Sequence, residues 1–251
     1  IGAFYIAFLE TEKRTRELVD AIVKSGGDPK TDDGRIAAFY KAYTNTQAID
    51  AAGLKPVAAD LARFAAITDK AGLSKALGEQ TRADVDPLNA TDFETENLFG
   101  IFVTQGLATP GDVIPYVLQG GLGMPEREYY LSGDAKMASI RTAYKTYIAT
   151  LLTEAGIADA DVKAGRIYDL EVKIAKAHAN REQSEDFTKS AGVWTKADFA
   201  AKAPGIDWDA YFAAAGLDKA AKFGAYHAAA ITGLSALVAS EPLDAWKDWL
   251  T

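Results

Sequence analysis

The stretch QGGLGMPEREYYL, residues 119–131, is the most specific part of this 251-residue chain. Its three glycines allow backbone conformations that other residues resist, and Pro125 favours a turn. Tyr129 and Tyr130 follow the turn as a pair of large side chains that can anchor it in a core. We therefore expect an ordered loop at these residues.

Two short apolar runs precede this loop, at residues 98–104 (LFGIFVT) and 113–118 (VIPYVL). Both are rich in β-branched and aromatic residues, and a Pro-Gly turn signal lies between them. The pattern predicts one small β-hairpin at about residues 98–118. Pro115 cannot donate a backbone hydrogen bond, so we expect the second strand to lie at an edge of its sheet.

The rest of the chain carries helical patterns. Apolar residues recur at spacings of three and four between charged residues, and alanine, the best helix former, is frequent. Gly26-Gly27 and Gly53 are stop signals, and Asp32 or Asp33 can cap the second helix. The predicted helices cover residues 3–25, 33–52, one opened by Pro56, one near 73–77, 134–156, 160–190, 208–215, 226–239 and 242–250. The expected fold class is mainly α: residues 1–251 form a single multi-helix lobe with one small hairpin.

Charge and composition exclude several classes of function. The net charge is −8 and the pI is about 4.9, so the clustered Lys and Arg that nucleic-acid phosphates require are missing. The chain contains no cysteine, which excludes disulfides and Cys-ligated zinc. No apolar run reaches the ~18 residues of a membrane span. We expect neither a nucleic-acid partner nor a transmembrane segment in this chain.

Motifs that carry catalysis are also missing. The sequence has no HExxH zinc-protease helix, no GxxxxGK[ST] phosphate loop and no GxSxG nucleophile turn. His178 stands four residues before Glu182, so both would share a face of the predicted 160–190 helix. That is half of a metal site, because a catalytic zinc needs three protein ligands. We therefore predict no catalytic residue and no metal ligand in this chain, and we expect His227 to be packed or exposed without a catalytic role.

The loop at residues 119–131 resembles a family signature, and we call it the signature loop. Its sequence is similar to QGGLGLPDRDYYL of the neprilysin-like zinc metallopeptidases, with conservative departures at Met124, Glu126 and Glu128. The matching residues, to which we assign a structural role, are Gly120, Gly121, Leu122, Gly123, Pro125, Arg127, Tyr129 and Tyr130. Segments 36–57, 167–178, 203–217 and 241–250 also resemble the family in the same order, so the likeness covers nearly the whole chain.

The resemblance implies a two-lobed enzyme. A thermolysin-like catalytic lobe would hold the zinc and the catalytic residues, and a helical lobe would enclose a cavity that admits only short peptides. This chain resembles the N-terminal helical lobe, so zinc is expected in the parent enzyme and not in this segment. Its partners would be the catalytic lobe of the same polypeptide and peptide substrates. The resemblance also implies an exported bacterial enzyme, periplasmic or envelope-attached.

One departure from the family concerns substrate binding. Near its start the family's helical lobe often has Gly-x-Phe followed by Leu-Arg, with basic residues that grip a substrate's terminal carboxylate. Gly2 and Phe4 match, but an ungapped reading places Phe8 at the arginine. We take Tyr5 and Phe8 as the candidates by which this chain lines the substrate cavity.

Two other interpretations remain open. The chain could be a stand-alone helical binding or scaffold module without enzymatic activity, or a metal enzyme that uses His178 and Glu182. It begins without a methionine and ends inside a helical pattern, so we expect a piece of a longer protein. An HExxH motif in the reading frame beyond Thr251 would favour the peptidase, whereas a stop codon just after Thr251 would favour the module.

Overall fold

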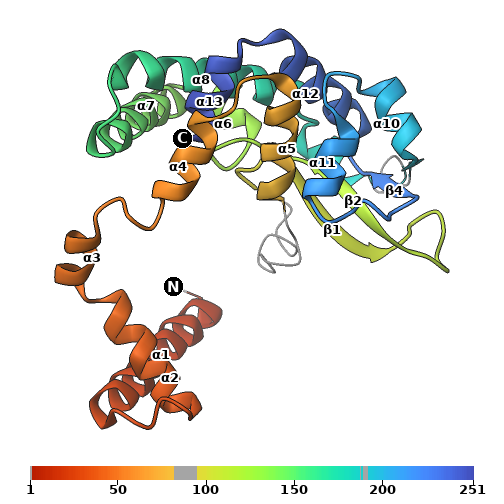
Figure 1. Ribbon diagram of the computed structural model, residues 1–251. Helices are drawn as coiled ribbons and strands as arrows, with labels where there is room; N and C mark the ends of the chain where they lie inside the picture. Colours follow the sequence, from red (N-terminus) through yellow and green to blue (C-terminus); the bar gives the residue numbers. More distant parts are fainter. Residues whose placement is uncertain (1, 82–94, 187, 189–191) are drawn as a thin grey trace. The chain divides into compact units, whose positions relative to one another are not determined.

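The chain has two compact units, which we call unit 1 (residues 1–59) and unit 2 (residues 60–251). The computed structural model describes residues 2–81, 95–186, 188 and 192–251 (Figure 1). Helices dominate both units, so the predicted mainly α class is confirmed. None of the helices within these described ranges is long and apolar enough to cross a membrane.

Unit 1 is a small group of helices. It contains α1 (Ala3–Ser25), α2 (Asp32–Tyr43) and α3 (Thr46–Ala52), and α2 crosses α1 (Figure 1). Gly34 permits the close turn between them, because an added Cβ would lie 1.8 Å from the Asp28 carbonyl oxygen. The predicted stops at Gly26 and Gly53 are confirmed, since both have positive φ at a helix end.

The predicted single helix over residues 33–52 is wrong in two respects. It breaks after Tyr43, because the Asn45 side chain accepts a hydrogen bond from the Ala48 N–H at 3.1 Å and starts a new helix. The first helix is capped by Thr31 and not by an aspartate, since the Thr31 hydroxyl accepts from the Gly34 N–H. The Asn45 cap therefore divides one periodic apolar pattern into two helices.

Unit 2 holds the remaining elements. α4 leads into it, and a four-stranded sheet with the order β1-β2-β4-β3 lies among its helices. Its helices are α4 (Ala58–Ala65), α5 (Lys70–Gln80), α6 (Arg127–Leu131), α7 (Ala135–Glu154), α8 (Ala160–Ala177), α9 (Arg181–Glu185), α10 (Lys196–Lys202), α11 (Trp208–Ala214), α12 (Ala228–Ser240) and α13 (Leu243–Leu250). Its strands are β1 (Phe99–Gln105), β2 (Val113–Gln119), β3 (Val193–Trp194) and β4 (Phe223–Ala225).

The predicted hairpin is confirmed, but its second strand is not at an edge. β1 and β2 pair antiparallel, and β4 pairs parallel to β2 on the other side. The prediction of an edge strand from Pro115 is therefore wrong. β4 meets β2 only at Tyr116 and Val117, so Pro115 lies outside that pairing and its missing N–H breaks no hydrogen bond to β4.

An aromatic core joins the sheet to the helices of unit 2. Phe199 of α10 packs 4.6 Å from Trp208 of α11 between ring centroids, and Phe212 stacks on Phe223 of β4 at 4.1 Å. Phe99 of β1 completes the group with an edge-on contact to Tyr211. Burial of such large rings, with offset or edge-on geometry, is a main source of stability. This core holds the end of β2 and the start of the signature loop.

Candidate functional site

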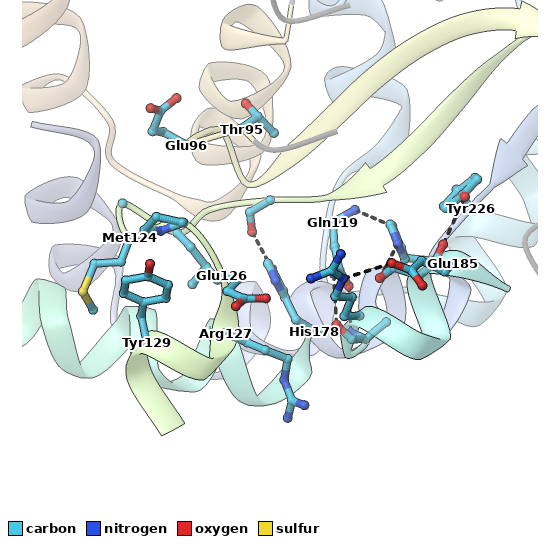
Figure 2. Close-up of a pocket in the computed structure, with 18 residues that line it drawn as sticks. Thr95, Glu96, Gln119, Met124, Glu126, Arg127, Tyr129, His178, Glu185 and Tyr226 are labelled. Atoms are coloured by element: carbon cyan, nitrogen blue, oxygen red, sulfur yellow. Dashed lines mark hydrogen bonds and ion pairs between the residues drawn. The ribbon is translucent and has the colours of Figure 1, made fainter. Parts of the chain in front are cut away.

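A pocket of about 870 Å³ opens beside the signature loop (Figure 2). Three parts of unit 2 line most of it: the signature loop after β2, the corner between α8 and α9, and the two residues before α12. The volume is in the range of pockets that hold small ligands. Its lining residues include Gln119, Gly120, Met124, Glu126, Arg127, His178, Arg181, Ser184, Glu185, Tyr226 and His227.

The corner of the pocket is formed where the predicted 160–190 helix ends early. α8 stops at Ala177, and His178 is extended, with ψ of 142°. The His178 Nε2–H donates to the Gly120 carbonyl oxygen at 2.8 Å, as the dashed line in Figure 2 shows. His178 and Glu182 therefore lie on different elements, and the prediction that they share a helix face is wrong. The reason is non-local: a loop 58 residues earlier in the chain binds the histidine.

Gln119 connects the end of β2 with two sides of the pocket. Its side-chain Oε1 accepts from the Ala179 N–H at 2.7 Å, and its Nε2 donates to the Ala179 carbonyl at 3.2 Å. Its backbone N–H donates to His227 Nδ1 at 3.2 Å. His227 is buried at 8% exposure, so one of its two expected placements, packing, is confirmed. These hydrogen bonds connect the end of β2 to the corner between α8 and α9 and to the residue before α12.

Ser184 and His227 form a hydroxyl–imidazole contact that cannot activate a nucleophile. Ser184 Oγ lies 3.2 Å from His227 Nε2. Because His227 Nδ1 accepts the Gln119 N–H, the proton of the neutral ring is on Nε2. Nε2 therefore donates to the serine and cannot take its proton, as a general base must. Burial lowers the pKa of both His178 and His227 to about 4, so both rings are neutral at pH 7.

A buried carboxyl group supports the signature loop from the protein interior. Glu171 of α8 is 3% exposed, and it accepts hydrogen bonds from Tyr130 OH at 2.8 Å and Tyr144 OH at 3.0 Å. The Met124 N–H donates to the same Tyr130 oxygen at 2.9 Å, which links the carboxyl group to the loop backbone. A Cβ at Gly123 would lie 2.0 Å from the Tyr144 oxygen, so a larger residue there would displace the Tyr144 side chain.

The signature residues have two roles in the structure: some connect the loop to the interior and others line the pocket. Gly121 has φ of +92°, which favours glycine, and Tyr130 is buried with its hydroxyl in the Glu171 network. Arg127 Nε donates to the Ala175 carbonyl at 3.2 Å and ties the loop to α8. The signature residues that line the pocket are Gly120, Leu122, Gly123, Pro125, Arg127 and Tyr129.

The substrate-cavity candidates Tyr5 and Phe8 belong to α1 of unit 1. Both are about half exposed, and their rings stack with centroids 6.4 Å apart. Phe8 also lines a groove of about 700 Å³ together with Tyr40 of α2. Their assignment to a substrate cavity stays a prediction.

Glu171 and Tyr144 support the loop, a role that was not predicted for them from the sequence. A signal was present, because Ile167, Leu170, Glu171 and Ile174 follow the i, i+3, i+4, i+7 spacing of one helix face. A single glutamate in an otherwise apolar face is rarely buried without a partner. Its partners could not be named from the sequence, since they come from two other helices.

The residues present do not fit a zinc ion. Within the part of the chain that the structure describes, no three His, Asp or Glu side chains come close enough together to hold a metal. The two pocket histidines already bond to protein groups through ring nitrogens. A zinc site needs at least three protein ligands, and the described residues hold no such set.

The stability of this chain should depend on pH through Glu171. Burial raises the pKa of Glu171 from 4.5 to about 7, against the opposing effect of its hydrogen bonds. The folded state therefore binds this proton more tightly than the unfolded state. The stabilisation that comes from this raised pKa is fully present below pH 4.5 and is lost as the pH rises to 7. The free energy of unfolding should fall by up to about 3 kcal/mol over that range. Urea unfolding between pH 4.5 and 8 measures it, and Glu171→Gln should remove this slope. An unchanged slope in that variant would assign the pH dependence to other groups.

The fold and the signature loop define the class of this protein: a helical, non-catalytic lobe of a neprilysin-like metallopeptidase. The chain belongs to peptidase family M13, because the model of the family's N-terminal part (Peptidase_M13_N) matches residues 1–251. The resemblance stated from the sequence is thereby confirmed.

Solved structures of one bacterial member are similar to this chain. An inhibitor complex of the zinc metalloprotease Zmp1 of Mycobacterium tuberculosis matches 99% of the chain with 25% identity and a TM-score of 0.81. The open state of the same protein matches 100% with 25% identity and a TM-score of 0.80, and a partially open state matches 99% with 26% identity and 0.67. This chain spans 37–38% of the Zmp1 chains.

Proposed function

We propose that this chain is the helical wall of a zinc metallopeptidase chamber and restricts its substrates to short peptides. The observation that carries the proposal is the match of 99% of the chain to the inhibitor complex of Zmp1. In the parent enzyme, zinc would polarise the scissile carbonyl and activate water. No residue of this chain takes part in that step; residues 1–251 together act as one lobe.

In this proposal the chain contributes the shape of the chamber wall and takes no part in bond cleavage. Folded proteins cannot enter an enclosed chamber, whereas a flexible peptide can, so selectivity arises from size. A wall of this kind must keep its form, and the signature loop is held by His178 from one side and by the Glu171 network from the interior. Tyr5 and Phe8 present an apolar, uncharged surface to substrate. The existence of an open and a partially open Zmp1 supports opening of the lobes as the step that admits the peptide.

Peptide hydrolysis by the full-length parent protein tests this function. We expect cleavage of a quenched peptide of about ten residues, loss of that activity with a zinc chelator, and recovery on adding zinc. A folded protein that carries the same cleavage sequence in a surface loop should be cut far more slowly. The 251-residue chain alone is the control and should be inactive. Chelator-sensitive cleavage by this chain alone would refute the proposal, as would equal rates on peptide and folded protein.

The parent enzyme would be exported by a bacterium and would act in the periplasm or at the cell envelope. This part of the proposal depends on the family resemblance. Cell fractionation with an antibody to the parent protein checks it, and a purely cytoplasmic pool would contradict it.

A further inference from the structure

A buried carboxyl group lies directly beneath an exposed part of the signature loop. Glu171 is 3% exposed, whereas Gly123 of the loop is exposed and lines the pocket. The Cβ position of Gly123 lies 3.3 Å from Glu171 Oε1. Gly123 therefore has one side toward the carboxyl group and another toward the pocket. Because this residue has no side chain, a small outward movement of its backbone would let water reach the carboxyl group.

Two tyrosine hydroxyls suit both protonation states of Glu171. Tyr130 OH and Tyr144 OH donate to the two oxygens of the ionised form at 2.8 and 3.0 Å. The two hydroxyls also act on each other as hydrogen-bond partners. In the protonated form, Glu171 can donate to Tyr144, Tyr144 to Tyr130, and Tyr130 to the other carboxyl oxygen, which closes a ring of three hydrogen bonds. The Tyr130 oxygen keeps its second lone pair for the Met124 N–H. Protonation therefore leaves none of these groups unpaired.

The helices that pack against Glu171 present neutral groups to it. α8 packs against α6, α7, α12 and α13. The titratable side chains that face Glu171 are Tyr130 of α6 and Tyr144 of α7, and Tyr168 of α8 itself stacks on Tyr130. Trp249 of α13 is a further hydrogen-bond donor. Helix α12 has the sequence AAAITGLSALVAS, without a titratable side chain. The neighbours of the carboxyl group are therefore neutral donors.

Cationic side chains of the same helices form contacts elsewhere. Lys173, two residues after Glu171, binds Glu241 at 2.7 Å. The other contacts of this kind are Lys163 and Arg166 with Asp248, Arg141 with the carbonyls of Tyr129 and Ser132, Arg127 with the Ala175 carbonyl, Lys145 with the Tyr168 ring, and Lys247 with the carbonyls of Ala65 and Ile67. The acidic Glu128 and Asp169 are exposed. A buried carboxylate among neutral donors is costly, and contact with water would stabilise it.

The signature loop has space into which it can move. The Met124 N–H ties the loop backbone to the Tyr130 hydroxyl, next to Gly123. The pocket of about 870 Å³ lies on the other side of the loop. Gly121 and Gly123 flank Leu122, and glycine tolerates changes of backbone conformation. An ionised Glu171 can therefore gain water by a local movement of the loop, while the aromatic core stays folded.

We infer that Glu171 is a pH-sensitive switch of the signature loop: its protonated form holds residues 122–124 against α8, and its ionised form releases them into the pocket. Burial raises the pKa of Glu171 to about 7. Release gives the carboxyl group water and lowers its pKa, so a rise in pH through 7 favours the released form. The consequence for catalysis rests on the proposed function, since the released loop would change the chamber wall that a peptide meets.

Hydrogen exchange of the full-length parent protein at pH 5.5 and pH 8 tests this switch. Each rate is divided by the intrinsic rate of the amide at that pH, so that only protection is compared. The protection of segment 119–131, which includes the Met124 amide, should fall by at least about tenfold between the two pH values. The control is segment 105–113, at the other end of β2, which opens without exposing Glu171. Its protection should change by less than about twofold.

Glu171→Gln distinguishes the switch from unspecific damage. Its amide can donate to Tyr144 while its carbonyl accepts from Tyr130, so the variant resembles the protonated form. Protection of segment 119–131 should then be the same at both pH values within about twofold, and at pH 8 it should exceed that of the wild type by about tenfold. A damaged fold would lose protection and could not gain it. Glu154→Gln, at an exposed glutamate of α7, should keep the wild-type fall.

A second variant keeps the inference testable if Glu171→Gln does not fold. Tyr144→Phe removes a hydrogen bond that favours the ionised form, so the fall in protection should move to higher pH. The inference is wrong if the wild-type loop keeps its protection at pH 8, if Glu171→Gln shows the wild-type fall, or if Tyr144→Phe leaves the pH of the fall unchanged. The readout does not involve peptide cleavage, so the switch can fail while the proposed function holds.

Discussion

Glu171→Ala should lower the free energy of unfolding of this chain by about 3–4 kcal/mol at pH 5. The substitution removes the acceptor of the Tyr130 and Tyr144 hydroxyls and leaves both buried groups without it. It also leaves a void beneath Gly123 and Met124, which a methyl group cannot fill. The loop above would then lose its interior support, so the effect should be larger than for any surface carboxyl group.

The size of this effect should itself depend on pH. At pH 5 Glu171 is protonated, because burial raises its pKa to about 7. At pH 8 the wild type carries a buried negative charge, so the difference between wild type and Glu171→Ala should narrow. Urea unfolding at the two pH values measures both differences.

Two matched variants distinguish the loss of the carboxyl network from an unspecific loss of stability. Glu171→Gln keeps the shape and an acceptor oxygen, so it should cost less than about 1.5 kcal/mol at pH 5. Glu154→Ala changes an exposed glutamate at the end of α7 and should stay within about 0.5 kcal/mol. If Glu171→Ala behaved like Glu154→Ala, the network would not support the loop.

Local signals predicted the elements whose ends depend on local chemistry. The helix over residues 3–25 ends at Gly26 as expected. A capping box of Thr195 and Asp198, another local device, starts α10. The prediction of one helix over residues 160–190 was wrong, although the sequence contains a local signal for where that helix ends. Asn180 and Gln183 form a capping box, a local signal for a new helix start that the apolar periodicity concealed.

Contacts between distant segments could not be predicted in the same way. β3 and β4 have only two and three residues, too few for any periodic pattern. β4 fits against β2 because Gly224 has no side chain: a Cβ there would lie 2.0 Å from the Tyr116 ring. Nothing in the sequence pairs residue 224 with residue 116, so the sheet was expected to end at the hairpin.

The candidate site was predicted as a loop but not as a pocket. The signature residues are contiguous in the sequence, and their glycines and tyrosines indicate an ordered turn. The pocket depends on two long-range hydrogen bonds: His178 to Gly120 across 58 residues of sequence, and Gln119 to His227 across 108. A sequence can therefore show which loop is fixed without showing what holds it.

Gly120→Ala should be the most damaging small substitution in the signature loop, with a loss of about 2–4 kcal/mol in the free energy of unfolding. Gly120 does not have positive φ, so the cost is one of space. An added Cβ would lie 2.2 Å from the Asn97 carbonyl oxygen and 2.6 Å from a Thr95 methyl group. The loop must move away from these atoms. Because the Gly120 carbonyl accepts the His178 ring N–H, that movement should also break this bond.

Two measurements distinguish this local effect from unspecific unfolding. By NMR titration, the pKa of His178 should rise from about 4 toward its ordinary 6.5 in Gly120→Ala, since the ring loses its buried position. Gly165→Ala is the matched control, because Gly165 lies inside α8 with open space around its Cβ position. Alanine there should stabilise the chain by about 0.5–1 kcal/mol and leave the pKa of His178 unchanged. A loss of stability without any change in that pKa would mean that the burial of His178 does not depend on the loop, and the proposed link between α8 and the signature loop through His178 would be wrong.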